Sequence, residues 1–163
     1  MRRATLDDLE AIVDIYNASI PGRLATADTL PVTFEQRLTW FEHHDDRRPL
    51  FVHEIEKSIA GWVSLEPFYG RPAYHATAEV SIYVSPDFQG KGIGSLMLKE
   101  CLAQCPALGI RNVVGYVFSH NQPSLTLLQR HGFKHWGELP EIAEMDGNLY
   151  SLSILGKCLD DTP

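Results

Sequence analysis

The sequence predicts an α+β fold in which one mixed β-sheet is covered by helices. Segments with helical apolar spacing and short β-branched or aromatic runs follow one another along the 163 residues. Their order is strand, two helices, three strands, helix, strand, helix and further strands. A glycine-rich loop stands between a strand and a helix just past the middle. No internal repeat, low-complexity tract or linker divides the chain. We therefore expect one domain over residues 1–163, long enough to bury roughly two-thirds of its unfolded surface.

Two helices are expected in the first quarter of the chain. Thr5 can cap the first, whose apolar positions recur at helical spacing to about Ser19. Residues 21–32 form a loop. Thr33 and Gln36 then have the spacing of a capping box, which predicts the start of the second helix.

The next segments have the character of strands. Leu50–Ile55 and Ile59–Leu65 are predicted to form a β-hairpin. Glu66–His75 contains two prolines and a glycine, which indicates a loop, and Ala76–Val84 returns to strand character. Alternation along this last strand puts one set of side chains on each face: Ala78, Val80, Ile82 and Val84 on one, Glu79, Ser81 and Tyr83 on the other.

Helices and strands alternate in the second half of the chain. Ser95–Leu108 is predicted to be a helix, Val113–Phe118 a buried strand, and Pro123–His131 another helix. Phe133–Trp136 and Leu149–Leu155 supply the last strands of the sheet.

Charge and cysteine content exclude several classes of protein. The formal charge of −7 argues against a nucleic-acid or anionic-membrane binder, which needs a basic surface. No apolar run approaches the roughly 20 residues that span a bilayer, and no signal-peptide pattern opens the chain, so we expect a cytoplasmic protein. Cys101 and Cys105 lie four residues apart and could share a metal, but the absence of partners at zinc-like spacing favours buried thiols, with Cys158 unpaired.

The glycine-rich loop is the most informative motif. Gly90, Gly92 and Gly94 lie between a strand and a helix, where glycine permits positive φ and close approach of a ligand. Unpaired N–H groups at a helix start attract phosphate, and Lys91 adds a positive charge. Neither a Walker loop nor a dinucleotide fingerprint fits, because Gly92 follows Lys91 and the glycine spacing is wrong. A phosphate-containing ligand is therefore expected; the alternative is a turn that binds nothing.

These residues resemble a known family. Gln89, Gly92 and Gly94 match the coenzyme A pyrophosphate loop of the GNAT acetyltransferases, and Asn121 and Ser124 match its second cofactor segment, which ends here in His131-Gly132-Phe133. The resemblance covers essentially the whole chain. It implies the GNAT fold, with a central, mostly antiparallel mixed sheet in which the strand ending at Val84 splays away from its neighbour. It also implies acetyl-CoA as cosubstrate, no metal and a homodimer.

A closer resemblance is to the phosphinothricin and methionine sulfoximine acetyltransferase branch, which acts on small amino-acid analogues. The stretches that carry it are Ile15-Tyr16-Asn17, residues 26–32, Trp40-Phe41, residues 70–74, residues 79–84 and Leu139-Pro140-Glu141. An enzyme for another amine (a polyamine, an antibiotic or a protein N-terminus) and a coenzyme A-binding sensor without turnover remain alternatives.

The resemblance also implies which residues form the site. Glu79 is the candidate general base; the less favoured alternative is a solvated or salt-bridged strand carboxylate. Tyr69, Arg71 and Tyr74 are the candidate acceptor-binding residues, with Arg71 as the carboxylate anchor or else a plain surface arginine. The expected cofactor-binding residues are Ile82, Tyr83, Val84, Gln89, Gly90, Lys91, Gly92, Ile93, Gly94, Ser95, Asn121 and Ser124.

Two features depart from the family pattern. Leu128 stands where many members have the tyrosine that protonates the leaving thiolate, so no general acid is assigned; Tyr116, His120 and His131 are possible substitutes. Residues 144–147, Glu-Met-Asp-Gly, replace a basic stretch of the branch and reverse its charge.

Overall fold

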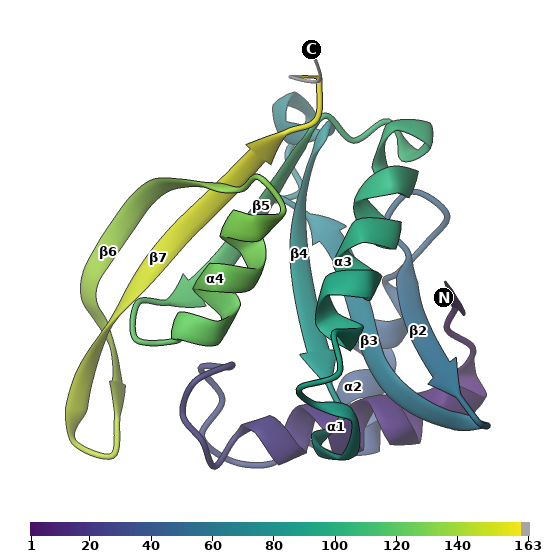
Figure 1. Cartoon of the computed structure of the whole chain (residues 1–163), viewed down its shortest axis with the longest axis horizontal. Helices are drawn as coiled ribbons and strands as arrows, with labels where there is room; N and C mark the ends of the chain where they lie inside the picture. Colours follow the sequence, from purple (N-terminus) through teal and green to yellow (C-terminus); the bar gives the residue numbers. More distant parts are fainter. Residues whose placement is uncertain (161–163) are drawn as a thin grey trace.

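The computed structural model describes residues 1–160, so residues 161–163 of the expected domain lie outside the described part (Figure 1). A seven-stranded sheet, in the order β1-β2-β3-β4-β5-β7-β6, is covered by helices. The strands are β1 (Arg2–Arg3), β2 (Leu50–Ile55), β3 (Ser58–Pro67), β4 (Thr77–Val84), β5 (Asn112–Phe118), β6 (Lys134–Met145) and β7 (Asn148–Cys158). The α-helices are α1 (Leu9–Ser19), α2 (Phe34–Glu42), α3 (Ile93–Gln104) and α4 (Gln122–Arg130).

The sheet is mixed and mostly antiparallel, as expected. Among the strand pairs of the described chain, β4 and β5 alone run parallel. They pair only over Thr77–Glu79 and Asn112–Val114. Beyond these residues the two strands diverge, so the sheet is split by an open wedge (Figure 1). This confirms the splay that the family resemblance implies.

Two apolar layers hold the helices on the sheet. On one face, α3 and α4 pack on Val63, Leu65 and Val80, and Figure 1 shows these helices side by side in front of the strands. On the other face, α1 and α2 pack on Val52 and Trp62. The alternation predicted for β4 is confirmed, because Val80, Ile82 and Val84 pack in the first layer while Tyr83 packs in the second.

The local signals place most helix starts correctly. Thr33 accepts a hydrogen bond from the Gln36 N–H at 3.2 Å, and the Gln36 side chain accepts one from the Thr33 N–H at 2.8 Å. The predicted capping box is therefore present. Thr5 precedes a short 3-10 turn over Leu6–Asp8, and the α-helix itself begins at Leu9.

Two of the predicted elements have bounds in the structure that differ for a clear physical reason. α3 begins at Ile93 and ends at Gln104, and residues 105–108 form a 3-10 turn, because the ring of Pro106 cannot continue an α-helix. β6 extends to Met145 instead of ending at Trp136. Pro140 and a long bulge between Leu139 and Ala143 hide this edge strand from a search for alternation.

The described chain contains no helix long and apolar enough to cross a membrane. Cys101 and Cys105 are both fully buried. The thiol of Cys105 donates to the Cys101 carbonyl at 3.4 Å, as expected for thiols that belong to the core. No group of three or more potential metal-ligating side chains occurs within residues 1–160.

Close approach of backbone to backbone makes Gly61 on β3 sensitive to substitution. A Cβ there would lie 2.7 Å from the Tyr83 carbonyl oxygen on β4 and 2.7 Å from Cε of Met97. Since the carbonyl cannot move without shifting β4, we expect Gly61→Ala to destabilise the fold by about 1–3 kcal/mol, a fall in Tm of roughly 3–10 °C. Differential scanning calorimetry would measure it. Gly22→Ala is the control, because its Cβ would meet only one atom, at 3.8 Å; equal melting of the two variants would contradict the argument.

Candidate active site

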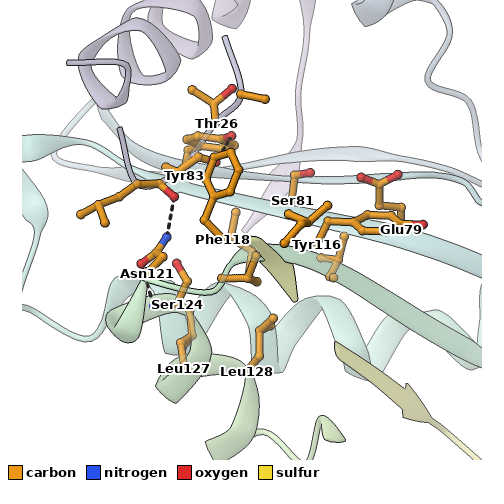
Figure 2. Close-up of a pocket in the computed structure, with 18 of the residues that line it drawn as sticks. Thr26, Glu79, Ser81, Tyr83, Tyr116, Phe118, Asn121, Ser124, Leu127 and Leu128 are labelled. Carbon is orange, nitrogen blue, oxygen red and sulfur yellow. Dashed lines mark hydrogen bonds between the residues drawn. The ribbon is translucent and has the colours of Figure 1, made fainter. Parts of the chain in front are cut away.

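A cleft of about 490 Å³ fills the wedge between β4 and β5 (Figure 2). Its walls come from the two diverging strands, the α1–α2 loop, the start of α4 and the β6–β7 hairpin. The lining residues are Leu24, Ala25, Thr26, Ala27, Glu79, Val80, Ser81, Ile82, Tyr83, Gly115, Tyr116, Val117, Phe118, Asn121, Ser124, Leu127, Leu128, Ile142, Ala143 and Leu152.

The divergence leaves one edge of β4 without a partner strand. Hydrogen bonds from the Ser85 N–H to Ala60 and from the Phe68 N–H to the Thr77 carbonyl, at 2.8 and 3.4 Å, show that odd-numbered residues of β4 face β3. The peptide groups of Val80, Ile82 and Val84 therefore point the other way, into the wedge. This edge can pair with an extended, amide-containing ligand, as expected for Ile82 and Val84.

The glycine-rich loop leads from β4 into α3 with the backbone that was predicted. Gly90 and Gly92 have φ values of 74° and 77°, a left-handed conformation that L-residues adopt at a cost. No side chain caps the N-terminus of α3, which begins at Ile93, so its first N–H groups are available to an anion. A Cβ on Gly94 would be 3.6 Å from Val84 and 3.5 Å from Leu127, ordinary van der Waals distances, so the helix start packs beside β4 and α4.

The polar side chains of the loop turn back onto the chain. The Gln89 amide donates to the Val84 carbonyl at 3.4 Å, and the Lys91 ammonium donates to the Asp87 carbonyl at 3.3 Å. The Ser95 hydroxyl bonds to Nε2 of His131 at 2.7 Å. The loop thus offers mainly backbone N–H groups to a phosphate, with Lys91 beside them.

Glu79 lies where the wedge opens, at the last position of β4 that is paired with β5. Figure 2 shows its carboxyl and the Tyr116 phenol at the same end of the cleft. Burial raises the pKa of Glu79, and the neighbouring Glu66 carboxylate on β3 raises it further. No ion pair involving Glu79 occurs within residues 1–160. A carboxyl with a raised pKa and no ion-pair partner in the described chain suits proton transfer better than structural ion pairing.

Asn121 is buried, and both of its polar atoms have partners within the chain. Its Oδ1 accepts from the Ser124 N–H at 3.2 Å and caps α4, while its Nδ2 donates to the Leu24 carbonyl at 3.1 Å (Figure 2). The side chain therefore joins the start of α4 to the α1–α2 loop. Ser124 lines the cleft directly.

Tyr83 lines the cleft, but its hydroxyl is engaged in a hydrogen bond within the chain. Its ring stacks on Trp62 at 4.6 Å between centroids, and its hydroxyl donates to the Ala25 carbonyl at 3.0 Å. The side chain thereby supports the α1–α2 loop where that loop forms a wall of the cleft.

The possible substitutes for the missing tyrosine occupy different places. Leu128 is buried at the floor of the cleft beside Gly115. His120 bonds to the Arg23 carbonyl and His131 bonds to Ser95, and neither lines the cleft. Tyr116 does line it, and burial, with Tyr69 and Glu79 nearby, raises its pKa, which keeps this phenol protonated.

The three acceptor-binding candidates lie on the β3–β4 loop, outside the lining of the cleft. The rings of Tyr69 and Tyr74 pack against Phe68, with centroids 4.6 and 5.4 Å away, and both remain exposed. Tyr69 adjoins Tyr116, which connects this loop to the Glu79 end of the cleft. Arg71 is exposed.

Sequence reasoning missed an entire wall of the site. Leu24–Ala27 on the α1–α2 loop and Ile142 on the β6 bulge line the cleft, although neither segment has a periodic or motif signal. Thr26 and Ala27 belong to residues 26–32, a stretch that matches the branch, and that match was the one available hint.

A parallel strand pair that opens beside a glycine-rich helix start, with a half-buried carboxyl lining the cleft, suits an enzyme that transfers an acyl group from a phosphate-containing donor. The family model described as the acetyltransferase (GNAT) family matches residues 9–133, so the chain belongs to this family and is an N-acetyltransferase.

Similar proteins carry related descriptions. "Putative phosphinothricin acetyltransferase YwnH" of Bacillus subtilis (strain 168) is 54% identical over 158 residues, which cover 96% of this chain and 97% of that protein. An L-methionine sulfoximine/L-methionine sulfone acetyltransferase of Pseudomonas aeruginosa is 28% identical, over 99% of this chain and 95% of that protein. The crystal structure of a phosphinothricin acetyltransferase from Sinorhizobium meliloti in complex with acetyl-CoA superposes with a TM-score of 0.91 at 28% identity, covering 96% of this chain and 86% of that one.

Proposed function

We propose that this enzyme transfers the acetyl group of acetyl-CoA to the amino group of a small amino-acid analogue such as phosphinothricin or methionine sulfoximine. The observation that carries the proposal is the cleft between β4 and β5: the half-buried Glu79 carboxyl lines it, and its β4 wall leads into the glycine-rich start of α3. The names of the similar proteins from Bacillus subtilis and Pseudomonas aeruginosa support this class of acceptor.

The cofactor side of the wedge suits the parts of acetyl-CoA. Backbone N–H groups at Ile93–Ser95 and the Lys91 ammonium would hold the pyrophosphate. The open edge at Ile82 and Val84 would pair with the amides of the pantetheine arm. A free N–H on this edge would also stabilise the oxyanion of the transition state, worth on the order of a few kcal/mol.

Glu79 would accept the proton of the acceptor amine, directly or through water. The amine nitrogen then attacks the thioester carbonyl carbon, a C–N bond forms, and the C–S bond breaks to release the thiolate. The first amine proton remains on Glu79 and passes to solvent. The nitrogen loses its second proton once the C–N bond has formed, and this proton balances the one that the thiolate takes from solvent. Leu128 supplies none, and a thiolate leaves readily without an acid. Arg71 would hold the acceptor carboxylate by a charge-assisted hydrogen bond.

The experiment that tests the proposal measures release of free thiol from acetyl-CoA with a panel of amines. The panel contains phosphinothricin, methionine sulfoximine, polyamines and peptides with free N-termini. We expect the two amino-acid analogues to give the highest kcat/KM. A higher value for a polyamine or peptide would assign a different acceptor, and tight coenzyme A binding without thiol release would indicate a sensor.

The cellular setting belongs to the same proposal. An enzyme that consumes acetyl-CoA works where acetyl-CoA is made, and we place it in the cytoplasm. The homodimer implied by the resemblance is supported by Trp136, Ile142 and Leu149, apolar side chains exposed on β6 and β7. Light scattering would return twice the chain mass of 18.3 kDa for the dimer.

A further inference from the structure

The tip of the β6–β7 hairpin is tied to the α1–α2 loop by Asp146 and Arg23, residues 123 positions apart in the sequence. Nε of Arg23 donates to Oδ2 of Asp146 at 2.8 Å, and Nη2 donates to Oδ1 at 3.3 Å. Both carboxylate oxygens are therefore engaged, which fixes the relative orientation of the two groups. The Arg23 side chain is 24% exposed and that of Asp146 is 62% exposed, so the pair lies at the surface.

Arg23 also holds its own loop together. Its Nη1 donates to the carbonyl of Thr29 at 3.1 Å and to that of Ile20 at 3.4 Å. The loop backbone is anchored from the other side of the cleft as well, since His120 bonds to the Arg23 carbonyl at 2.8 Å and Asn121 to the Leu24 carbonyl at 3.1 Å. A single arginine thus connects three segments: the α1–α2 loop, the end of β5 and the hairpin.

Two of these segments line the cleft and meet at the Arg23–Asp146 pair. The α1–α2 loop continues from Arg23 into Leu24–Ala27, and the hairpin carries Ile142 and Leu152. Because the ion pair joins the two walls, the separation between them depends on it. The glycine-rich loop and α3 make no contact with this pair among the described hydrogen bonds and ion pairs. Asn121 and Tyr83, also expected on the cofactor side, bond to the backbone carbonyls of Leu24 and Ala25 and not to the Arg23 or Asp146 side chains.

The ion pair also accounts for the acidic stretch at residues 144–147. The reversed charge at Asp146 has a partner, and the left-handed backbone at Asp146 and Gly147, with φ of 53° and 77°, makes the turn that presents it. We propose that Arg23 and Asp146 are a positioning pair that sets the affinity of the enzyme for the acceptor and leaves its affinity for acetyl-CoA unchanged. The inference rests on the proposed acetyl transfer to an amine acceptor.

A double-mutant cycle on this pair provides the test. Asp146→Asn removes the negative charge and keeps a residue that tolerates positive φ. Arg23→Lys keeps the positive charge but loses the planar guanidinium that donates two hydrogen bonds to the carboxylate. We expect Asp146→Asn to raise the acceptor KM roughly two- to fivefold, the range of an exposed ion pair, with the KM for acetyl-CoA unchanged. The two substitutions together should have less than the product of their separate effects. Asp46→Asn is the matched control, because it removes an exposed carboxylate paired with Arg3 at 3.3 Å.

Hydrogen exchange gives a second readout that does not depend on an acceptor. Amides of residues 22–30 should exchange faster in Asp146→Asn than in Asp46→Asn. Unchanged exchange, an unchanged acceptor KM, an equal rise in the acetyl-CoA KM or fully multiplicative effects would each overturn the inference. If the wild-type enzyme acetylates no amine in the panel, the proposed function fails. Hydrogen exchange still tests the ion pair in that case, because faster exchange in Asp146→Asn supports a role in positioning the loop and unchanged exchange contradicts it.

Discussion

Replacing Glu79 by Gln is expected to lower kcat/KM for the acceptor by a factor of about 10²–10⁴ at neutral pH. The amide is nearly the same size but cannot accept the amine proton. The wild-type enzyme should lose activity as the pH falls through the pKa of Glu79, which burial and Glu66 raise above the usual range. The variant should lack this acidic limb. Initial rates measured across the pH range would show both effects, and full kcat/KM for the variant at every pH would contradict the role of Glu79.

Glu66→Gln provides the matched control for this prediction. Glu66 and Glu79 are directly opposite on β3 and β4, and the Glu66 charge raises the pKa of Glu79. Removing it should leave the enzyme active and move the acidic limb to lower pH. An acidic limb that does not move would mean that the limb belongs to another group.

Stability separates loss of chemistry from loss of fold. Because the folded-state pKa of Glu79 is raised, its contribution to stability is fully present below the unfolded-state pKa and is lost as the pH rises through the folded-state value. At neutral pH, Glu79→Gln should therefore be at least as stable as the wild type. Thermal unfolding at pH 7 would show this, and a lower Tm would indicate that the carboxylate has a structural partner.

Replacing Gly92 by Val is expected to raise the KM for acetyl-CoA at least about tenfold, equivalent to roughly 1.4 kcal/mol of binding free energy. Gly92 has a φ of 77°, and no atom lies within 4 Å of the position of a Cβ. A β-branched residue would strain the loop and would project its side chain into the open space beside the start of α3. The stabilisation of the protein by saturating acetyl-CoA, measured as a shift in Tm, should shrink accordingly.

Gly147→Val is the matched control for Gly92→Val. Gly147 has the same φ of 77°, and its Cβ would likewise meet nothing within 4 Å, but it lies in the β6–β7 turn, away from the phosphate-binding loop. Both variants carry the same backbone strain, and only Gly92→Val should weaken the binding of acetyl-CoA. Equal loss of acetyl-CoA affinity in the two would show that general strain, and not the loop, is responsible.

The sequence by itself determined the donor side of this enzyme. Gln89 to Gly94 are contiguous, and their chemistry depends on local backbone conformation: positive φ at Gly90 and Gly92 and a helix that begins directly afterwards. Alternation in β4 likewise predicts the faces of Glu79 and Tyr83 from neighbouring residues alone. Such features need no tertiary information because glycine conformation, capping and side-chain alternation act within a few residues.

Only the tertiary structure decided how the acceptor side is built. The wall at Leu24–Ala27 comes from an irregular loop, and Ile142 comes from a bulge that breaks the alternation of β6. Both are placed by contacts between distant segments, such as Asn121 with Leu24 and Asp146 with Arg23. An ion pair 123 residues apart leaves no periodic trace in the chain. Local rules therefore predict the glycine loop and the ligand proposed for it, whereas the part of the cleft lined by Leu24–Ala27 and Ile142 exists only once the sheet has brought these segments together.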